Sequence, residues 1–158
     1  MNILVLCTGN SARSILLETL INSQSAGRLQ AYSAGSAPAG NVHPQSLKLL
    51  SEHGHDTSLA RSKSWDEFAT SDAPKMDMVI TVCGSAAAET CPIWPGAPVR
   101  AHWGVEDPAA AVEPDWDPAF RTAYDILKKR ASALLDLPFE TLAPQELSAE
   151  LARIGDLT

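Results

Sequence analysis

The stretch Cys7-Thr8-Gly9-Asn10-Ser11-Ala12-Arg13-Ser14 stands between the apolar run of residues 2–6 and a helical pattern that begins at Ser14. A loop that leaves a strand and enters a helix directs several backbone N–H groups toward one point, and the helix dipole adds partial positive charge there. Such a loop binds tetrahedral oxyanions. We therefore predict that residues 8–14 bind an anionic substrate: Thr8, Gly9, Asn10, Ser11, Ala12, Arg13 and Ser14.

Cys7 and Arg13 give this loop its chemistry. The guanidinium of Arg13 is able to fork onto two oxygens of a bound anion. The same positive field favours the thiolate form of Cys7, which is the nucleophilic form. Gly9 lets the backbone approach the anion closely, and Asn10 tolerates the left-handed conformation that a tight loop needs. The alternative is that Cys7 is only a small buried side chain at a strand end.

Strand and helix patterns alternate along the rest of the chain. Apolar runs predict strands at residues 2–6, 31–35, 76–82 and 99–103. Helices are predicted at residues 14–25, 44–53 and 65–68, from Pro118 to Pro138 with Asp117 as N-cap, and at residues 144–155. This alternation indicates the α/β class, as one doubly wound sheet of four parallel strands with helices on both faces. We expect a single domain that spans residues 1–158.

Composition narrows the classes of function. The net charge of −7 argues against a nucleic-acid or anionic-membrane surface, because both need clustered Lys and Arg. No signal peptide is visible, and no stretch approaches the roughly 20 apolar residues of a membrane span. Three cysteines in a chain without an export signal are typical of reactive thiols. Together these features predict a cytoplasmic protein. The four histidines show no metal-binding spacing, and we expect neither a metal nor a cofactor.

The pair Asp107-Pro108 follows the fourth predicted strand. Loops at the carboxyl ends of parallel strands share one edge of the sheet, so Asp107 is expected near the anion loop. Expulsion of hydroxide or alkoxide near neutral pH needs a proton donor, which a carboxyl group supplies. We predict that Asp107 is the general acid, with Glu106 as the alternative donor. Taken alone, an Asp-Pro pair more often only begins a turn.

Cys83 and Cys91 flank a second stretch of interest, directly after the third strand. Cys83 is expected near Cys7, because the first and third strands would be neighbours in the sheet. Residues 85–89 favour a helix, which would separate Cys83 from Cys91 by about 12 Å. A disulfide needs Cα atoms within about 7 Å, so these two cysteines would pair only if that helix unwinds.

These motifs resemble a known family. Cys-x5-Arg-Ser at the N-terminus resembles the low-molecular-weight tyrosine phosphatase fold, and residues 82–92 and 101–110 are similar to its arsenate reductase branch. The resemblance implies reduction of arsenate to arsenite, with Arg13 as anion ligand, Asp107 as acid and a thiol relay through Cys7, Cys83 and Cys91. It also implies thioredoxin, or glutaredoxin with glutathione, as reductant. Seven residues separate Cys83 from Cys91, one more than in the best-known thioredoxin-coupled members, so both reductants stay open.

Two other functions fit part of the sequence. Cys7, Arg13 and Asp107 suffice for phosphotyrosine hydrolysis through a cysteinyl phosphate, as in a low-molecular-weight protein tyrosine phosphatase. That reading leaves Cys83 and Cys91 without a role, and the loops that should flank a phenyl ring contain few aromatic residues. A non-catalytic anion-binding protein would explain the loop but not the three thiols.

Overall fold

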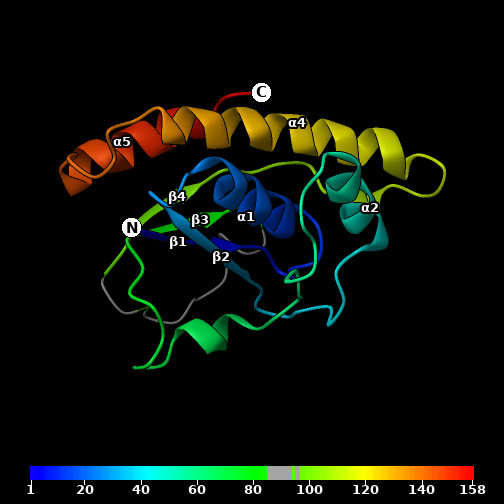
Figure 1. Ribbon diagram of the computed structural model, residues 1–158, viewed down its shortest axis with the longest axis horizontal. Coiled ribbons are helices and arrows are strands. Elements are labelled where there is room, and N and C mark those ends of the chain that lie inside the picture. Colours follow the sequence, from blue (N-terminus) through cyan, green and yellow to red (C-terminus); the bar gives the residue numbers. More distant parts are fainter. Residues whose placement is uncertain (85–93, 95–96) are drawn as a thin grey trace.

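The centre of the protein is a four-stranded parallel sheet, seen in a computed structural model that describes residues 1–84, 94 and 97–158. The strand order is β2-β1-β3-β4 (Figure 1). The single parallel sheet predicted from the sequence is confirmed, with its strands at β1 (Asn2–Leu6), β2 (Gln30–Ala34), β3 (Met78–Thr81) and β4 (Val99–His102). Because β1 lies between β2 and β3, the chain that follows β1 leaves the sheet near its middle.

The helices begin close to where capping residues and prolines predict them. They are α1 (Arg13–Gln24), α2 (Pro44–Glu52), α4 (Trp116–Leu135) and α5 (Pro144–Gly155), with 3-10 helices η1 (Trp65–Phe68) and η2 (Pro108–Ala110). Pro44 and Pro144 each occupy the first helical turn, where the missing N–H has no intrahelical partner to lose. Among the residues that the structure describes, no helix is both long and apolar enough to cross a membrane.

The start of α4 corrects one expectation. The helix begins at Trp116, after Asp115, and not at Pro118 with Asp117 as its N-cap. Asp117 lies inside the first turn, where its carboxylate accepts a hydrogen bond of 2.8 Å from Nε of Arg121, one turn along the helix. An acidic side chain at that place interacts favourably with the helix dipole as well as with Arg121.

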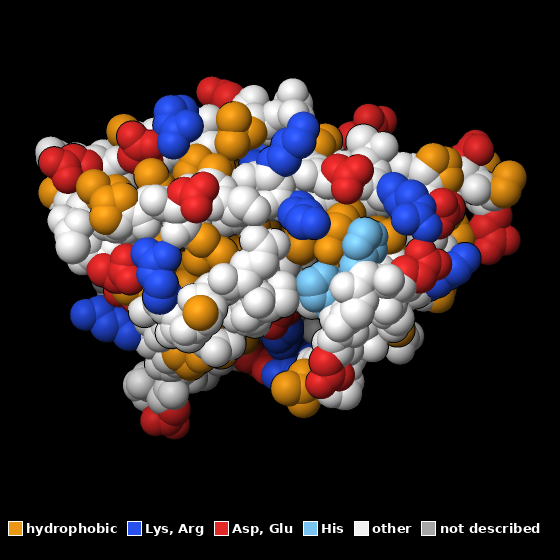
Figure 2. All heavy atoms as spheres, turned by 45° about the horizontal axis from the view of Figure 1, so that its top comes forward, with side chains coloured by type: hydrophobic (Ala, Val, Ile, Leu, Met, Phe, Trp, Pro, Cys, Tyr) orange, Lys and Arg blue, Asp and Glu red, His pale blue; other side chains and the backbone are white. Residues whose placement is uncertain are grey.

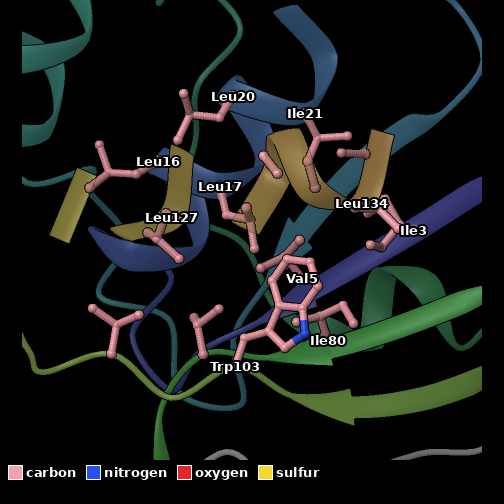
Figure 3. Close-up of a cluster of buried hydrophobic side chains, with 14 of the residues drawn as sticks. Ile3, Val5, Leu16, Leu17, Leu20, Ile21, Ile80, Trp103, Leu127 and Leu134 are labelled. Carbon is pink, nitrogen blue, oxygen red and sulfur yellow. The ribbon is translucent and has the colours of Figure 1, made fainter. Parts of the chain in front are cut away.

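Each face of the sheet is covered by its own apolar cluster. Helices α1, α4 and α5 lie over one face (Figure 1), and their side chains form the larger cluster with alternate residues of the strands (Figure 3). The opposite face carries Leu4, Leu6 and Val79, which pack with Phe68 of η1 and with Trp94. Because β1 is buried on both faces, its sequence is a continuous apolar run and does not alternate. Labelled members of the larger cluster are Ile3, Val5, Leu16, Leu17, Leu20, Ile21, Ile80, Trp103, Leu127 and Leu134.

The register brings the carboxyl ends of all four strands to one edge. Leu6 pairs with Ala34 of β2 and with Thr81 of β3, and Thr81 pairs with His102 of β4. The segments that follow β1, β3 and β4 therefore start side by side. In open parallel sheets this edge is where ligands bind.

Charge is spread over the surface. On the face shown in Figure 2, Lys and Arg side chains are interspersed with those of Asp and Glu, and no basic patch forms there.

Candidate active site

The loop of residues 7–14 is held open by hydrogen bonds to its carbonyl groups. The carbonyl oxygens of Thr8, Gly9 and Ser11 accept from the N–H groups of Ala37, Ala39 and His43, over 2.9–3.0 Å. In a trans peptide the C=O and the following N–H point in opposite directions. Carbonyls that face the surrounding chain therefore turn the N–H groups of the loop toward its centre, as an oxyanion site requires.

Asn10 fixes the shape of the loop. Its φ is 46°, in the left-handed region that the sequence predicts, and its side chain is fully buried. The amide Nδ2 donates to Ser14 Oγ over 2.8 Å, while Oδ1 accepts from the N–H of Lys63 over 2.9 Å. Because Ser14 Oγ accepts this bond, its own hydroxyl hydrogen stays able to donate to an anion or to a thiol.

Arg13 is the first residue of α1 and reaches from the loop to the segment after β4. Its Nη1 donates to the carbonyl of Val105 over 2.7 Å, and Nη2 lies 3.6 Å from Oδ2 of Asp107. Nε is buried and has no hydrogen-bond partner within the part of the chain that the structure describes. Leaving a buried donor unpaired costs about 1–3 kcal/mol, so an acceptor from outside the chain, such as an oxyanion, is favoured there.

Asp107 lies at the start of η2 and is half-exposed. Oδ1 accepts from the N–H of Ala109 over 3.0 Å, which fixes the carboxyl group at the start of the 3-10 helix. The segment itself is held against the sheet by the N–H of Val105, which donates to the carbonyl of Val82 over 3.1 Å. Asp107 thus combines the turn-forming role of an Asp-Pro pair with a position beside Arg13.

Cys7 and Cys83 are the two cysteines among the described residues, and both are buried. They follow the neighbouring strands β1 and β3, which pair up to Leu6 and Thr81, and the Cys83 thiol influences the pKa of Cys7. Thr8 Oγ1 lies 3.6 Å from Sγ of Cys83, within hydrogen-bond range for sulfur. The predicted proximity of Cys7 and Cys83 is therefore observed.

The protonation of Cys7 differs from the sequence expectation. The neighbouring Cys83 thiol and burial raise the pKa of the Cys7 thiol above its ordinary value. The charge of Arg13 and the N–H of Gly9 lower that pKa, as predicted, but they do not prevail. The expectation of a thiolate counts the field of the loop, which does lower this pKa, and leaves out the neighbouring thiol and the loss of solvent, which raise it.

The site therefore unites most of the residues predicted for it. Cys7, the loop of residues 8–14, Cys83 and Asp107 meet at the carboxyl edge of the sheet, whereas Cys91 and the predicted helix 85–89 lie outside the described residues. Glu106 is adjacent to Asp107 in the chain, and no described contact links it to Arg13. The described residues contain no group of three His, Cys, Asp or Glu side chains that could hold a metal ion.

Three residues that support the loop were not predicted. A Cβ at Gly35 would lie 2.3 Å from the carbonyl oxygen of Thr8, so this position excludes any side chain. Ser62 Oγ donates to the carbonyl of Gly9 over 3.0 Å, and the N–H of Lys63 binds Asn10. Gly35 was detectable as the glycine that ends the second strand at the edge of the sheet. Ser62 and Lys63 carry no such signal, because they lie in a polar segment far along the chain.

Comparisons with known proteins agree with this geometry. Residues 2–152 match the family described as low molecular weight phosphotyrosine protein phosphatase. An arsenate reductase of Halalkalibacterium halodurans is 38% identical over 127 residues, which are 79% of this chain and 88% of the relative.

Two solved structures resemble the fold. An arsenate reductase in the phosphate binding state superposes with a TM-score of 0.66 and 27% identity, covering 85% of this chain and 95% of that one. The thioredoxin-dependent arsenate reductase of Corynebacterium glutamicum has a TM-score of 0.58 and 27% identity, over 80% of this chain and 58% of its own.

Proposed function

The chain belongs to the low molecular weight phosphotyrosine protein phosphatase family, and we propose that it works within this family as a cytoplasmic arsenate reductase. The observation that carries the proposal is the position of two buried cysteines, Cys7 and Cys83, directly after the neighbouring strands β1 and β3, with Sγ of Cys83 3.6 Å from Oγ1 of Thr8. Hydrolysis of a phosphate ester needs one thiol. Transfer of two electrons to arsenic needs a second thiol within reach of the first, and Cys83 is in that position.

In the first step the loop binds arsenate as H₂AsO₄⁻, through its N–H groups, Ser14 and Arg13. Sγ of Cys7 forms a bond to arsenic, and one oxygen leaves as water. The products are Cys7–S–AsO₃H⁻ and H₂O, so the proton of the thiol ends on the departing oxygen. Asp107 is the carboxyl group that passes this proton, and its position beside Arg13 supports that role.

In the second step Cys83 attacks Sγ of Cys7. The S–As bond breaks, its electron pair stays on arsenic, and arsenic falls from As(V) to As(III). The proton of the Cys83 thiol leaves with the product, H₂AsO₃⁻, and a Cys7–Cys83 disulfide remains. The burial of both sulfur atoms supports this order, because it keeps external thiols from the intermediate.

The third thiol and an external dithiol together return the enzyme to its starting state. Cys91 attacks Cys83, which frees Cys7 and moves the disulfide to Cys83 and Cys91. A dithiol partner then reduces that disulfide. Thioredoxin is the first partner to test, because one of the similar solved structures is that of a thioredoxin-dependent arsenate reductase. Glutaredoxin with glutathione is the second.

The decisive experiment measures arsenite released from arsenate by the purified protein, with thioredoxin and glutaredoxin systems supplied separately. We expect steady turnover with one of the two systems. A Cys83→Ser variant should release no arsenite beyond background, although it should still bind the oxyanion. Turnover that survives in this variant would contradict the relay.

Hydrolysis of phosphotyrosine is the alternative, since Cys7, Arg13 and Asp107 also meet the needs of that reaction. The same preparations should be assayed with an aryl phosphate. Hydrolysis that is insensitive to Cys83→Ser, together with no arsenite release under either reductant, would replace the proposed function by a phosphatase.

A further inference from the structure

Lys63 is a buried charged residue that the reaction above does not use. Its side chain is 7% exposed, and its ammonium is in contact with three parts of the chain. Nζ donates to the carbonyl of Arg61 over 3.1 Å and to Ser33 Oγ of β2 over 3.4 Å. It lies 3.9 Å from the carboxylate of Glu18 on α1, to which Ser33 Oγ also donates.

Burying these charges is unfavourable by itself. Loss of solvent lowers the pKa of Lys63 and raises that of Glu18, and each charge partly offsets the effect on the other. Desolvation of a buried ion pair costs several kcal/mol, which an apolar side chain of the same length would avoid. The fold alone therefore gives no reason for an ammonium here.

The backbone around Lys63 lies directly against the oxyanion loop. The N–H of Lys63 donates to Oδ1 of Asn10, and Ser62 Oγ donates to the carbonyl of Gly9. The carbonyl of Lys63 accepts from the N–H of Gly35 over 2.9 Å, and Gly35 in turn touches Thr8. Residues 61–64 thus form a brace along one side of the loop, and the ammonium of Lys63 ties this brace to α1 and β2.

We propose that Lys63 is a positioning residue for oxyanion binding. Its ammonium fastens residues 61–64 to Glu18 and Ser33, so that the Lys63 N–H holds Asn10 in its left-handed conformation and the loop N–H groups stay turned inward. Without the ammonium, the brace and Asn10 gain freedom, and the anion must order them on binding. This inference deepens the proposed function, on which it rests only for the identity of the anion as arsenate.

The test measures anion binding without turnover. Phosphate bound in the loop is expected to protect Cys7 from alkylation by iodoacetamide, and peptide mass spectrometry reads the alkylation of Cys7 separately from that of the other thiols. In Lys63→Met, which keeps the length of the side chain and removes the charge, we expect the phosphate concentration for half-protection to rise roughly ten- to hundredfold. Lys128→Met is the matched control, because Lys128 is exposed on α4. In this variant the phosphate concentration for half-protection of Cys7 should equal that of the wild type.

Chemical rescue separates positioning from general stability. Lys63→Ala leaves the Glu18 carboxylate and Ser33 hydroxyl without their ammonium, and Glu18 also lines a surface hollow of about 370 Å³ together with Asn22 and His55. Methylammonium chloride is expected to restore protection by phosphate in this variant. Tetramethylammonium chloride at equal ionic strength should not, because it has no N–H group to donate.

Three outcomes would overturn the inference. They are unchanged half-protection in Lys63→Met, rescue by both salts alike, and recovery of thermal stability with methylammonium while protection stays weak. Because this readout needs no arsenic chemistry, a wild-type protein that binds phosphate but releases no arsenite would overturn the proposed function and leave the role of Lys63 intact.

Discussion

Nη2 of Arg13 lies 3.6 Å from Oδ2 of Asp107, so the residue proposed to bind the oxyanion also positions the residue proposed to donate the proton. The same guanidinium holds the segment before Asp107 through the carbonyl of Val105. Anion binding and proton transfer are therefore linked through one side chain, and changes at either residue should affect both.

Arg13→Lys tests this link. Lysine has no fork, so a single ammonium cannot serve an anion, Val105 and Asp107 together. We expect kcat/KM for arsenate to fall roughly 10²- to 10³-fold, the usual effect of removing an oxyanion donor. Arg153→Lys, in an exposed ion pair with Glu150, is the matched control. The measurement is steady-state arsenite release by both variants. Equal decreases of kcat/KM in the two would contradict a specific role for Arg13.

Asp107→Asn removes the proton and keeps the local structure, because the amide oxygen still accepts from the N–H of Ala109. We expect kcat to fall by about 10²- to 10⁴-fold with the unfolding temperature preserved. Glu106→Gln should retain most of the activity. A loss confined to the Glu106 variant would move the acid to that residue.

Cys83→Ala should make Cys7 more acidic. The Cys83 thiol raises the pKa of Cys7, so its removal leaves the charge of Arg13 and the N–H of Gly9, which lower that pKa, opposed by burial alone. A lower pKa means more thiolate at a given pH, so alkylation of Cys7 should become faster near neutral pH and its midpoint should move to lower pH. Cys83→Ser keeps a hydrogen-bonding group at this position but removes the thiol that can ionise. Comparison of the two variants therefore separates the effect of hydrogen bonding on the pKa of Cys7 from the effect of charge on Cys83. An unchanged midpoint in Cys83→Ala would show that burial alone controls the thiol.

Gly35→Ala should displace the oxyanion loop at Thr8. The new Cβ would lie 2.3 Å from the carbonyl oxygen of Thr8, and backbone has to move to relieve the contact. We expect a loss of about 1–3 kcal/mol in the free energy of unfolding, measured with urea, together with weaker phosphate protection of Cys7. Gly9→Ala is the control for stability, because its Cβ would meet nothing closer than 3.7 Å. Similar destabilisation by both changes would argue against a steric cause.

The sequence contains enough information for the sheet and the centre of the site. Short apolar runs such as residues 2–6 predict buried strands, and the parallel arrangement then brings the residues after β1, β3 and β4 to one edge. The same argument predicts Cys83 near Cys7 and Asp107 near the anion loop, where the structure has them. The start of α4 was wrong by two residues because Asp115 and Asp117 are both plausible caps, and only the Arg121 contact separates them.

The contacts of Lys63 that support the oxyanion loop could not be predicted from the sequence, for a physical reason. The surroundings of Lys63 come from α1, β2 and residues 61–64, and no pattern along the chain shows that Glu18 and Ser33 meet an ammonium. The pKa of Cys7 was misjudged for a related reason. A loop motif shows the charges that it carries itself, whereas burial and the thiol of Cys83 belong to the folded environment.

The register of β1 and β3 has a consequence for how this scaffold acquires chemistry. Leu6 is level with Thr81, so Cys83, two positions past the end of β3, is level with Thr8, the neighbour of Cys7 in the chain, and its Sγ lies 3.6 Å from Oγ1 of Thr8. A substitution at position 83 changes the neighbour of Thr8 and leaves Arg13 and Asp107 in place. In the proposed relay Cys83 is the thiol that hydrolysis does not need, so this position is where a change by design should separate reduction from hydrolysis most directly.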